Sequence, residues 1–502
     1  MSGTSVTAVT PAPPAADTTG EAPTGPHPRD RPARPAATLA AVNTAALLVL
    51  MAFTTPLAVL PDTVRHLDSG PTGPAWILSS ISLGLSATQL TAGSLADILG
   101  RRRVFIAGAV GFAASSALTA LAGSLALFVT GRILQGIAGA ALLAAGLGLV
   151  GHAFPTGAAR VRATATVGAT FGAGIAVGPL AAAELTRVAG HAAPYLLQAA
   201  AALALAVAST SLLSESRSPA RRGLDPLGAL TLGGGIGTLT AALVEGRQGW
   251  GRPTVAALLV TAAVLLAAYA ATALRGRDPM VDPRLLRRPA FRLSVLGSLI
   301  TGIAVIAVAS YLPTLFQGLL GLSPLQSAAV LSFWSFTSVA ASLIAGRVSS
   351  GVRARRQMAL GLAVIGAGFL GLLGMDAGAP WAVVVPGLVV AGVGLGLLNA
   401  ASTRLAVESV PPDRAGMGAG ASNTARYTGA SLGGALVVAV VQSAPGDTPL
   451  DALSTGGHRV LLLGAALSLL GALVAALTRN EDHPQLIRPT TQENTYQERQ
   501  ES

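Results

Sequence analysis

Fourteen apolar runs, each near 20 residues long, follow one another along this chain of 502 residues. A helix of about 20 apolar residues crosses the hydrocarbon layer of a bilayer, because it satisfies its backbone hydrogen bonds internally. Only 11% of the residues are charged, whereas 51% are hydrophobic. We therefore predict an all-α polytopic membrane protein with 14 transmembrane helices.

The runs form a six, two, six pattern. The first six predicted spans lie near 39–60, 76–97, 104–122, 125–150, 163–184 and 194–213. Two central spans lie near 226–244 and 252–274. The last six lie near 293–313, 327–348, 357–375, 379–401, 421–442 and 459–477. We accordingly predict five parts: a disordered cytoplasmic tail (1–37), an N-terminal six-helix half (38–213), two extra helices with basic linkers (214–292), a C-terminal six-helix half (293–478) and a cytoplasmic tail (479–502).

Positive charge is unevenly placed and comes from arginine alone. The chain has 33 basic residues, none of them lysine, and a net charge of +11. Most arginines fall between spans on the side of the two termini, and cytoplasmic loops collect positive charge. We therefore expect a multi-pass protein of the plasma membrane with both termini in the cytoplasm. No soluble basic domain is present, so a nucleic-acid partner is not expected.

The turn between the second and third spans reads Gly93-Ser94-Leu95-Ala96-Asp97-Ile98-Leu99-Gly100-Arg101-Arg102-Arg103. This G-x-L-A-D-x-x-G-R-R-R pattern resembles the signature of the major facilitator superfamily. The central pair of spans makes the chain similar to its 14-span drug:proton antiporter branch, over about residues 39–477. The resemblance implies two six-helix halves that rock around a central cavity.

The same resemblance implies a conformational latch at this turn, with Gly93, Asp97, Gly100, Arg101 and Arg102 as its residues. An anion is poorly placed at a helix C-terminus but is stabilised at an N-terminus. The family places the acid of this motif against the cytoplasmic N-terminus of a helix in the other half, here the thirteenth span. The alternative is a local Asp–Arg pair within the turn.

An arginine also lies inside the fourth span, in Gly131-Arg132-Ile133-Leu134-Gln135-Gly136. An ionisable group within a span is a functional candidate. The motif is similar to one whose arginine takes part in proton coupling in the family, so Arg132 and Gln135 are candidates for coupling or for substrate binding. The alternative is a structural partner for Asn or Gln groups on neighbouring helices.

Small residues gather in the fifth span. The spacing of Gly174 and Gly178 lets another helix approach closely, and Pro179 bends its helix. Gly178-Pro179 resembles the antiporter motif found in exporters, although alanines follow it where two glycines are common. General helix packing is the alternative. The first span differs more from the antiporter branch, because Ala52 occupies the place where the branch usually has an acid.

Polar or amphipathic residues in or near other spans are candidates for lining a cavity. They are Gln89, Gln198, Tyr311, Gln317, Trp334, Asn399 and Tyr427. Aromatic residues make up only 4% of the chain, so the cavity should be mostly aliphatic. Such a lining favours a broad, apolar substrate over a sugar, which needs many hydrogen-bond partners.

We therefore predict a secondary active transporter that exports a hydrophobic small molecule, such as a drug, antibiotic or secondary metabolite, in exchange for protons. The alternative is a proton-independent facilitator or importer, which the missing first-span acid favours. The chain has no cysteine and only six histidines, and we expect neither an enzyme nor a metal site nor a cofactor. Its expected partners are the substrate, protons and the lipid bilayer, and we expect a monomer.

The topology can be tested with reporter fusions. Fusions after residue 222 and at the C-terminus should both report the cytoplasmic side, because eight spans separate these points. Opposite sides for the two fusions would refute the even number of spans between them.

Overall fold

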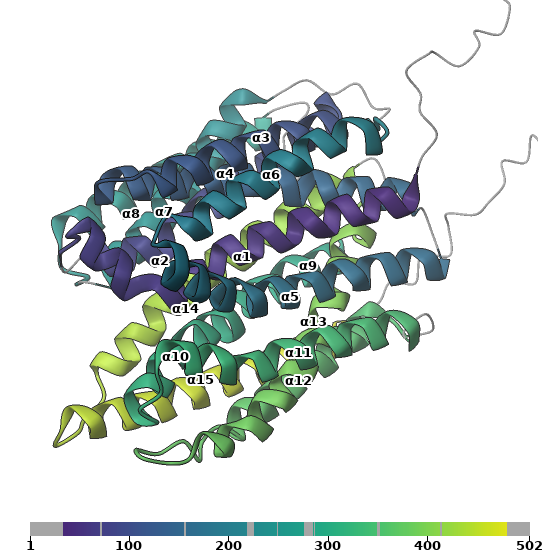
Figure 1. Ribbon diagram of the computed structural model, residues 1–502. Coiled ribbons are helices and arrows are strands. Elements are labelled where there is room, and N and C mark those ends of the chain that lie inside the picture. Colours follow the sequence, from purple (N-terminus) through teal and green to yellow (C-terminus); the bar gives the residue numbers. More distant parts are fainter. Residues whose placement is uncertain are drawn as a thin grey trace, which may run out of the picture. The chain divides into compact units, whose positions relative to one another are not determined.

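The computed structural model describes residues 34–70, 73–154, 157–217, 225–247, 249–275, 285, 287–348, 352–411 and 414–478. These residues form long helices joined by short connections, as Figure 1 shows. Nearly all of the predicted N-terminal tail and the whole C-terminal tail lie outside the described residues, as do parts of both basic linkers. The predicted disorder of the tails therefore stays a prediction.

Fourteen continuous helices cover the predicted spans. The first eight are α1 (Pro35–Leu67), α2 (Gly73–Leu99), α3 (Arg101–Ala120), α4 (Leu125–Ala153), α5 (Gly157–Ala189), α6 (Ala193–Leu212), α7 (Pro226–Gly246) and α8 (Pro253–Arg275). The ninth joins α9 (Pro289–Ile300), a π-helical segment η2 (Thr301–Ile306) and α10 (Ala307–Leu319). The remaining five are α11 (Pro324–Val348), α12 (Ala354–Leu370), α13 (Val385–Glu408), α14 (Ala415–Gln442) and α15 (Pro449–Leu477), with the short 3₁₀ turn η4 (Trp381–Val384) before α13. The predicted all-α fold with 14 helices is confirmed.

Several helices are longer than the apolar runs that predict them. The helix α14 begins at Ala415 rather than near 421, and α15 begins at Pro449 rather than near 459. The additional turns contain glycines in α14 and, in α15, an acidic first turn capped by the Thr448 side chain. Helical geometry can continue beyond the hydrocarbon layer, where polar side chains are tolerated, so hydrophobicity alone finds only the central part of each helix.

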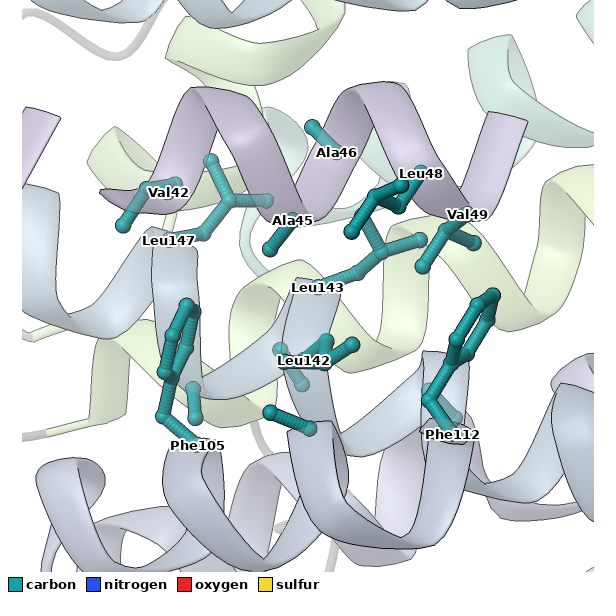
Figure 2. Packing of buried hydrophobic residues seen from close by; sticks show 14 of the residues in the cluster. Val42, Ala45, Ala46, Leu48, Val49, Phe105, Phe112, Leu142, Leu143 and Leu147 are labelled. Carbon is teal, nitrogen blue, oxygen red and sulfur yellow. The ribbon is translucent and has the colours of Figure 1, made fainter. Parts of the chain in front are cut away.

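Each set of six helices has its own buried core. One core joins helices α1 to α6 and includes Ala419 and Tyr427 of α14, and a second joins helices α9 to α15. Figure 2 shows the first, where Val42 and Ala45 of α1 lie over Leu143 and Leu147 of α4, with Phe105 of α3 beyond them. Lipid is as apolar as these side chains, so close packing rather than escape from water stabilises such contacts.

The two sets of helices meet along a few pairs. The helix α2 contacts α14, and α5 contacts α11 and α13. The central helix α7 packs on α2 and α14, while α8 packs on α7 and is largely exposed at its surface. A methyl group at Gly93 of α2 would lie 2.2 Å from the carbonyl oxygen of Gly416 of α14, so these backbones touch without side chains between them.

The glycines of α5 serve contacts on two sides. A methyl group at Gly178 would lie 2.2 Å from Thr54 Oγ1 and 2.9 Å from the Cα atom of Met51, both on α1. Gly174 is similarly close to Leu50. Gly172 instead faces Ser338 of α11, where a methyl group would lie 3.2 Å from the hydroxyl oxygen. The pair Gly174 and Gly178 therefore joins α5 to α1 within one half.

We expect Gly178→Leu to abolish transport, because the side chain would push α1 and α5 apart where backbone atoms of Met51 lie close. Gly111→Leu in α3 is the matched control, since a methyl group there meets only the Ala138 side chain, at 3.4 Å. Efflux and membrane abundance should be measured for both variants. Unchanged efflux with Gly178→Leu would refute the packing role.

Candidate functional site

Asp97, at the end of α2, is buried and lies at the first turn of α14. Its Oδ1 atom accepts hydrogen bonds from Arg101 Nε at 3.0 Å and Nη2 at 2.9 Å. Its Oδ2 atom accepts one from the backbone N–H of Met417 at 3.2 Å. An anion at a helix N-terminus is stabilised by up to about 2 kcal/mol when partly buried. The carboxylate thus joins two helices from opposite halves, and its role as a latch stays a prediction.

The arginines of the motif are held by residues that the sequence analysis did not identify. Arg101 Nη1 donates to the carbonyl oxygen of Gly148 at 3.2 Å, and a side chain at Gly148 would collide with this guanidinium. Glu215 accepts the backbone N–H of Arg102 at 3.2 Å and lies 3.7 Å from Arg103 Nε. Gly100 adopts a positive φ of 111° at the start of α3, close to the same carboxylate.

A second contact joins the halves toward the same end. Ser342 Oγ of α11 donates to the carbonyl oxygen of Ala165 of α5 at 2.9 Å. Helices alternate in direction, so the start of α5 and the ends of α2 and α11 share one side of the bundle. Together with Asp97, this contact joins the two halves at that side.

Arg132 is fully buried inside the first half. Its Nη1 donates to Gln135 Oε1 at 2.5 Å and its Nη2 to the carbonyl oxygen of Ala52 at 2.8 Å. The guanidinium carbon lies 5.9 Å from the ring centre of Tyr195. Gln135 extends the network, since its Nε2 donates to Gln198 Oε1 at 3.1 Å. These contacts join α4 to α1 and α6.

A central cavity lies between the halves, with a volume of about 80 Å³. Its walls come from α1, α5, η2, α10, α11, α13 and α14. Of the predicted lining residues it contains Trp334, Asn399 and Tyr427. The π-helical segment supplies Thr301, and such segments are frequent at functional sites.

Other predicted lining residues lie elsewhere. Tyr311 lines an adjoining cavity of about 390 Å³, and Gln317 and Pro179 line a smaller one. Gln198 belongs to the network of Arg132. Gln89 is buried in α2, where a methyl group at Gly420 of α14 would lie 2.7 Å from its carbonyl oxygen. Neither glutamine is among the residues that line the central cavity, and neither is Arg132.

A comparison with known families matches residues 42–434 to the model described as Major Facilitator Superfamily. The chain belongs to this superfamily. The match spans the signature turn, the network of Arg132 and the central cavity, and it confirms the resemblance that the turn at Asp97 carries.

Known members of the superfamily share substantial sequence with this chain. The puromycin resistance protein pur8 of Streptomyces alboniger is 31% identical over 404 residues, which cover 80% of this chain and 80% of that protein. The multidrug efflux pump LfrA of Mycolicibacterium smegmatis is 30% identical over 403 residues, which also cover 80% of this chain and 80% of that protein. The crystal structure of the human organic anion transporter MFSD10 has a TM-score of 0.64 at 19% identity, covering 89% of this chain and 100% of that one. At that identity the structural likeness shows the fold alone.

Arg426 is a cavity residue that sequence reasoning missed. It belongs to Asn423-Thr424-Ala425-Arg426, a segment similar to the antiporter branch, yet nothing in that pattern indicates the direction of the side chain. In the structure it lines the central cavity beside Tyr427. The signal that was available is the position of an arginine inside the apolar run 421–442, the criterion by which Arg132 is noticed.

We expect Asp97→Asn to reduce transport at least tenfold, because the neutral amide loses the charge that binds Arg101 and the N-terminus of α14. Membrane abundance should stay near normal, since the shape of the side chain is kept. Asp62→Asn is the matched control, because Asp62 is half-exposed and, among the described residues, pairs with Arg65 of its own helix. Full activity of Asp97→Asn would contradict the latch, and loss of the protein itself would indicate a folding role.

Proposed function

We propose that this protein exports hydrophobic small molecules (a drug, an antibiotic or a secondary metabolite) by alternating access. The observation that carries the proposal is the central cavity between the halves, whose lining is mostly apolar. Ligand pockets for molecules of drug size have volumes of about 300–1,000 Å³ and predominantly apolar walls. The central cavity, at about 80 Å³, is smaller than this range, whereas the adjoining cavity lined by Tyr311, at about 390 Å³, lies within it.

The contacts at the Asp97 end supply the alternation. Asp97 binds the first turn of α14, and Ser342 binds Ala165, so both contacts must break for the cavity to open on that side. We infer that this is the cytoplasmic side, since the arginine-rich turn lies there and both termini share it. Each contact is a few hydrogen bonds, which suits an equilibrium between two states of similar free energy.

The names of the relatives support export. A resistance protein for puromycin and a multidrug efflux pump are 31% and 30% identical to this chain. Bacterial members of this kind also support a place in the plasma membrane, as a multi-pass protein with both termini inside. A monomer suffices for the mechanism, because one chain supplies both halves and the cavity.

The driving force has two candidates. Exchange for protons is what the resemblance implies. A proton-independent facilitator is supported by a specific observation, because no carboxylate is among the described residues that line the central cavity. Ala52 contributes only its carbonyl oxygen to Arg132, and Glu245 is occupied by Trp76 and Arg252. Neither place offers an acid that faces the substrate.

The two candidates can be separated in cells that express the protein. Accumulation of puromycin and of a panel of apolar drugs should fall relative to cells with Asp97→Asn. If protons drive export, collapsing the pH gradient with nigericin should abolish the difference. Export that persists with both the pH gradient and the membrane potential collapsed would rule out the antiporter. Equal accumulation in both cell lines, for every compound, would contradict export.

A further inference from the structure

Arg426 projects from the middle of α14 into the central cavity and is 93% buried, with 7% of its surface exposed. No hydrogen bond or ion pair joins its side chain to any residue that the structure describes, and its Nε atom is buried without an acceptor. Its guanidinium carbon lies 5.8 Å from the centre of the Phe171 ring. Arginine stays charged at any accessible pH, so this is a buried cation without a counter-charge.

Two other buried arginines, Arg101 and Arg132, differ from Arg426 because polar groups of the protein accept their hydrogen bonds. Arg101 has Asp97, and Arg132 has Gln135 and the carbonyl oxygen of Ala52. A buried charge is strongly unfavourable unless it is paired or hydrogen-bonded. A guanidinium that lacks such partners beside a cavity is therefore prepared for a partner that arrives with the ligand.

Four further polar side chains of the cavity also favour a ligand that accepts hydrogen bonds. The hydroxyls of Thr54, Thr301 and Ser310 donate to carbonyl oxygens of their own helices, at 3.0, 2.7 and 2.7 Å. Trp334 Nε1, like Arg426 Nε, is a donor without an acceptor among the described residues. Guanidinium and indole N–H groups donate only, so a ligand that supplies acceptor oxygens would complete them.

We propose that the substrate is an apolar, aromatic organic anion, such as a carboxylate, sulfonate or phenolate, and that Arg426 binds its anionic group. This proposal rests on the export function and specifies its substrate class. The apolar part of the ligand would lie against Phe53, Phe171, Trp334 and Tyr427, which all line the cavity. Arginine suits this role, because its planar donors match the two oxygens of such a group.

The backbone around Arg426 is held closely. A methyl group at Gly302 of η2 would lie 2.1 Å from the carbonyl oxygen of Arg426, and one at Gly429 would lie 2.4 Å from that of Leu299. The two helices therefore touch through their backbones next to the charge. Met417, which binds Asp97, lies nine residues earlier in α14, or roughly 14 Å along the helix axis. The charge of Arg426 is thus deep in the bundle, away from the end where Asp97 lies.

A second arginine places positive charge still farther from the Asp97 end of the bundle. Arg247, just after α7, lines the adjoining cavity of about 390 Å³ and packs against Gly434 of α14. Gly434 lies eight residues beyond Arg426, or about 12 Å along the helix. The Nη1 atom of Arg247 donates to Ser79 Oγ at 3.2 Å, and no carboxylate lines this cavity among the described residues. The two cavities share Phe53 and Ser310, so an anion leaving Arg426 would meet Arg247 next.

The charge of the ligand determines how the membrane potential acts on transport. A full cycle that carries one anion across, with no carboxylate to exchange a proton, moves one negative charge. A membrane potential of 100 mV, negative inside, would favour outward movement by about fiftyfold at equilibrium. Export of an organic anion would therefore proceed down the electrical gradient.

Binding tests the proposal independently of transport. Three probes share one ring system and differ in charge: naphthalene-2-sulfonate, 2-naphthamide and 2-naphthylmethylammonium. Calorimetric titration into the full chain in nanodiscs should show the sulfonate binding at least tenfold more tightly than the amide, and the ammonium most weakly. Equal affinities for the sulfonate and the amide would overturn the proposal, and this measurement needs no variant.

Variants assign the preference to the residue. Arg426→Gln should weaken sulfonate binding at least tenfold while amide binding changes less than twofold, and Arg426→Lys should lie between the wild type and Arg426→Gln. Arg292→Gln is the matched control, because it removes one positive charge at an exposed position of α9. Equal losses for sulfonate and amide in Arg426→Gln would make Arg426 a structural residue and overturn its role.

Transport separates this proposal from the export function. Efflux of naphthalene-2-sulfonate from proteoliposomes should accelerate with a valinomycin–potassium potential that is negative inside and should be unaffected by a pH gradient imposed with buffers at the same potential. Movement of neutral or cationic drugs without sulfonate binding would leave export standing and refute the anion site. Selective sulfonate binding that depends on Arg426, with no efflux of any compound, would support the site and refute export.

Discussion

Burying guanidinium groups in a bundle that must cross hydrocarbon is the constraint on which the rest of this structure depends. Each buried arginine requires a group that replaces water, and the group it has determines what it does. Asp97 neutralises Arg101 and ties two halves together, whereas Gln135 and a carbonyl oxygen hold Arg132 within one half. Arg426 has neither, and it alone of the three faces the cavity. The proposed latch, the structural network and the proposed ligand site thus differ in the partners of their arginines.

Close approach of backbones is the second requirement, because the charged contacts need the helices at short range. Asp97 reaches the first turn of α14 because Gly93 and Gly416 let the two helices touch. Gly302 and Gly429 do the same next to Arg426. Interfaces made of small residues gain from packing but bring no side chains that interlock deeply, so they can part and reform. Stability and movement therefore come from the same residues.

The spans could be predicted from the sequence because a helix that crosses hydrocarbon must be apolar over its whole crossing length. The turn at Asp97 was recognisable because its spacing resembles a known signature. The start of α14 was missed, since glycines such as Gly416 carry little hydrophobic signal. The direction of a side chain is also absent from the sequence, so Gln198 was expected in the cavity but belongs to the network of Arg132. Long-range partners such as Glu215 for the backbone of Arg102 could not be read from spacing at all.

The charge of a transport cavity and the source of its driving force are linked. A cavity lined by a carboxylate can exchange a proton for a cation, because the acid titrates within the cycle. An arginine does not titrate, so a cavity whose one charge is Arg426, among the residues that the structure describes, has nothing to exchange. It can still be driven, because the charge carried by the ligand responds to the membrane potential directly. On this argument, a cavity that has Arg426 on α14 and no acid at the place of Ala52 suits the potential-driven export of anions that we propose.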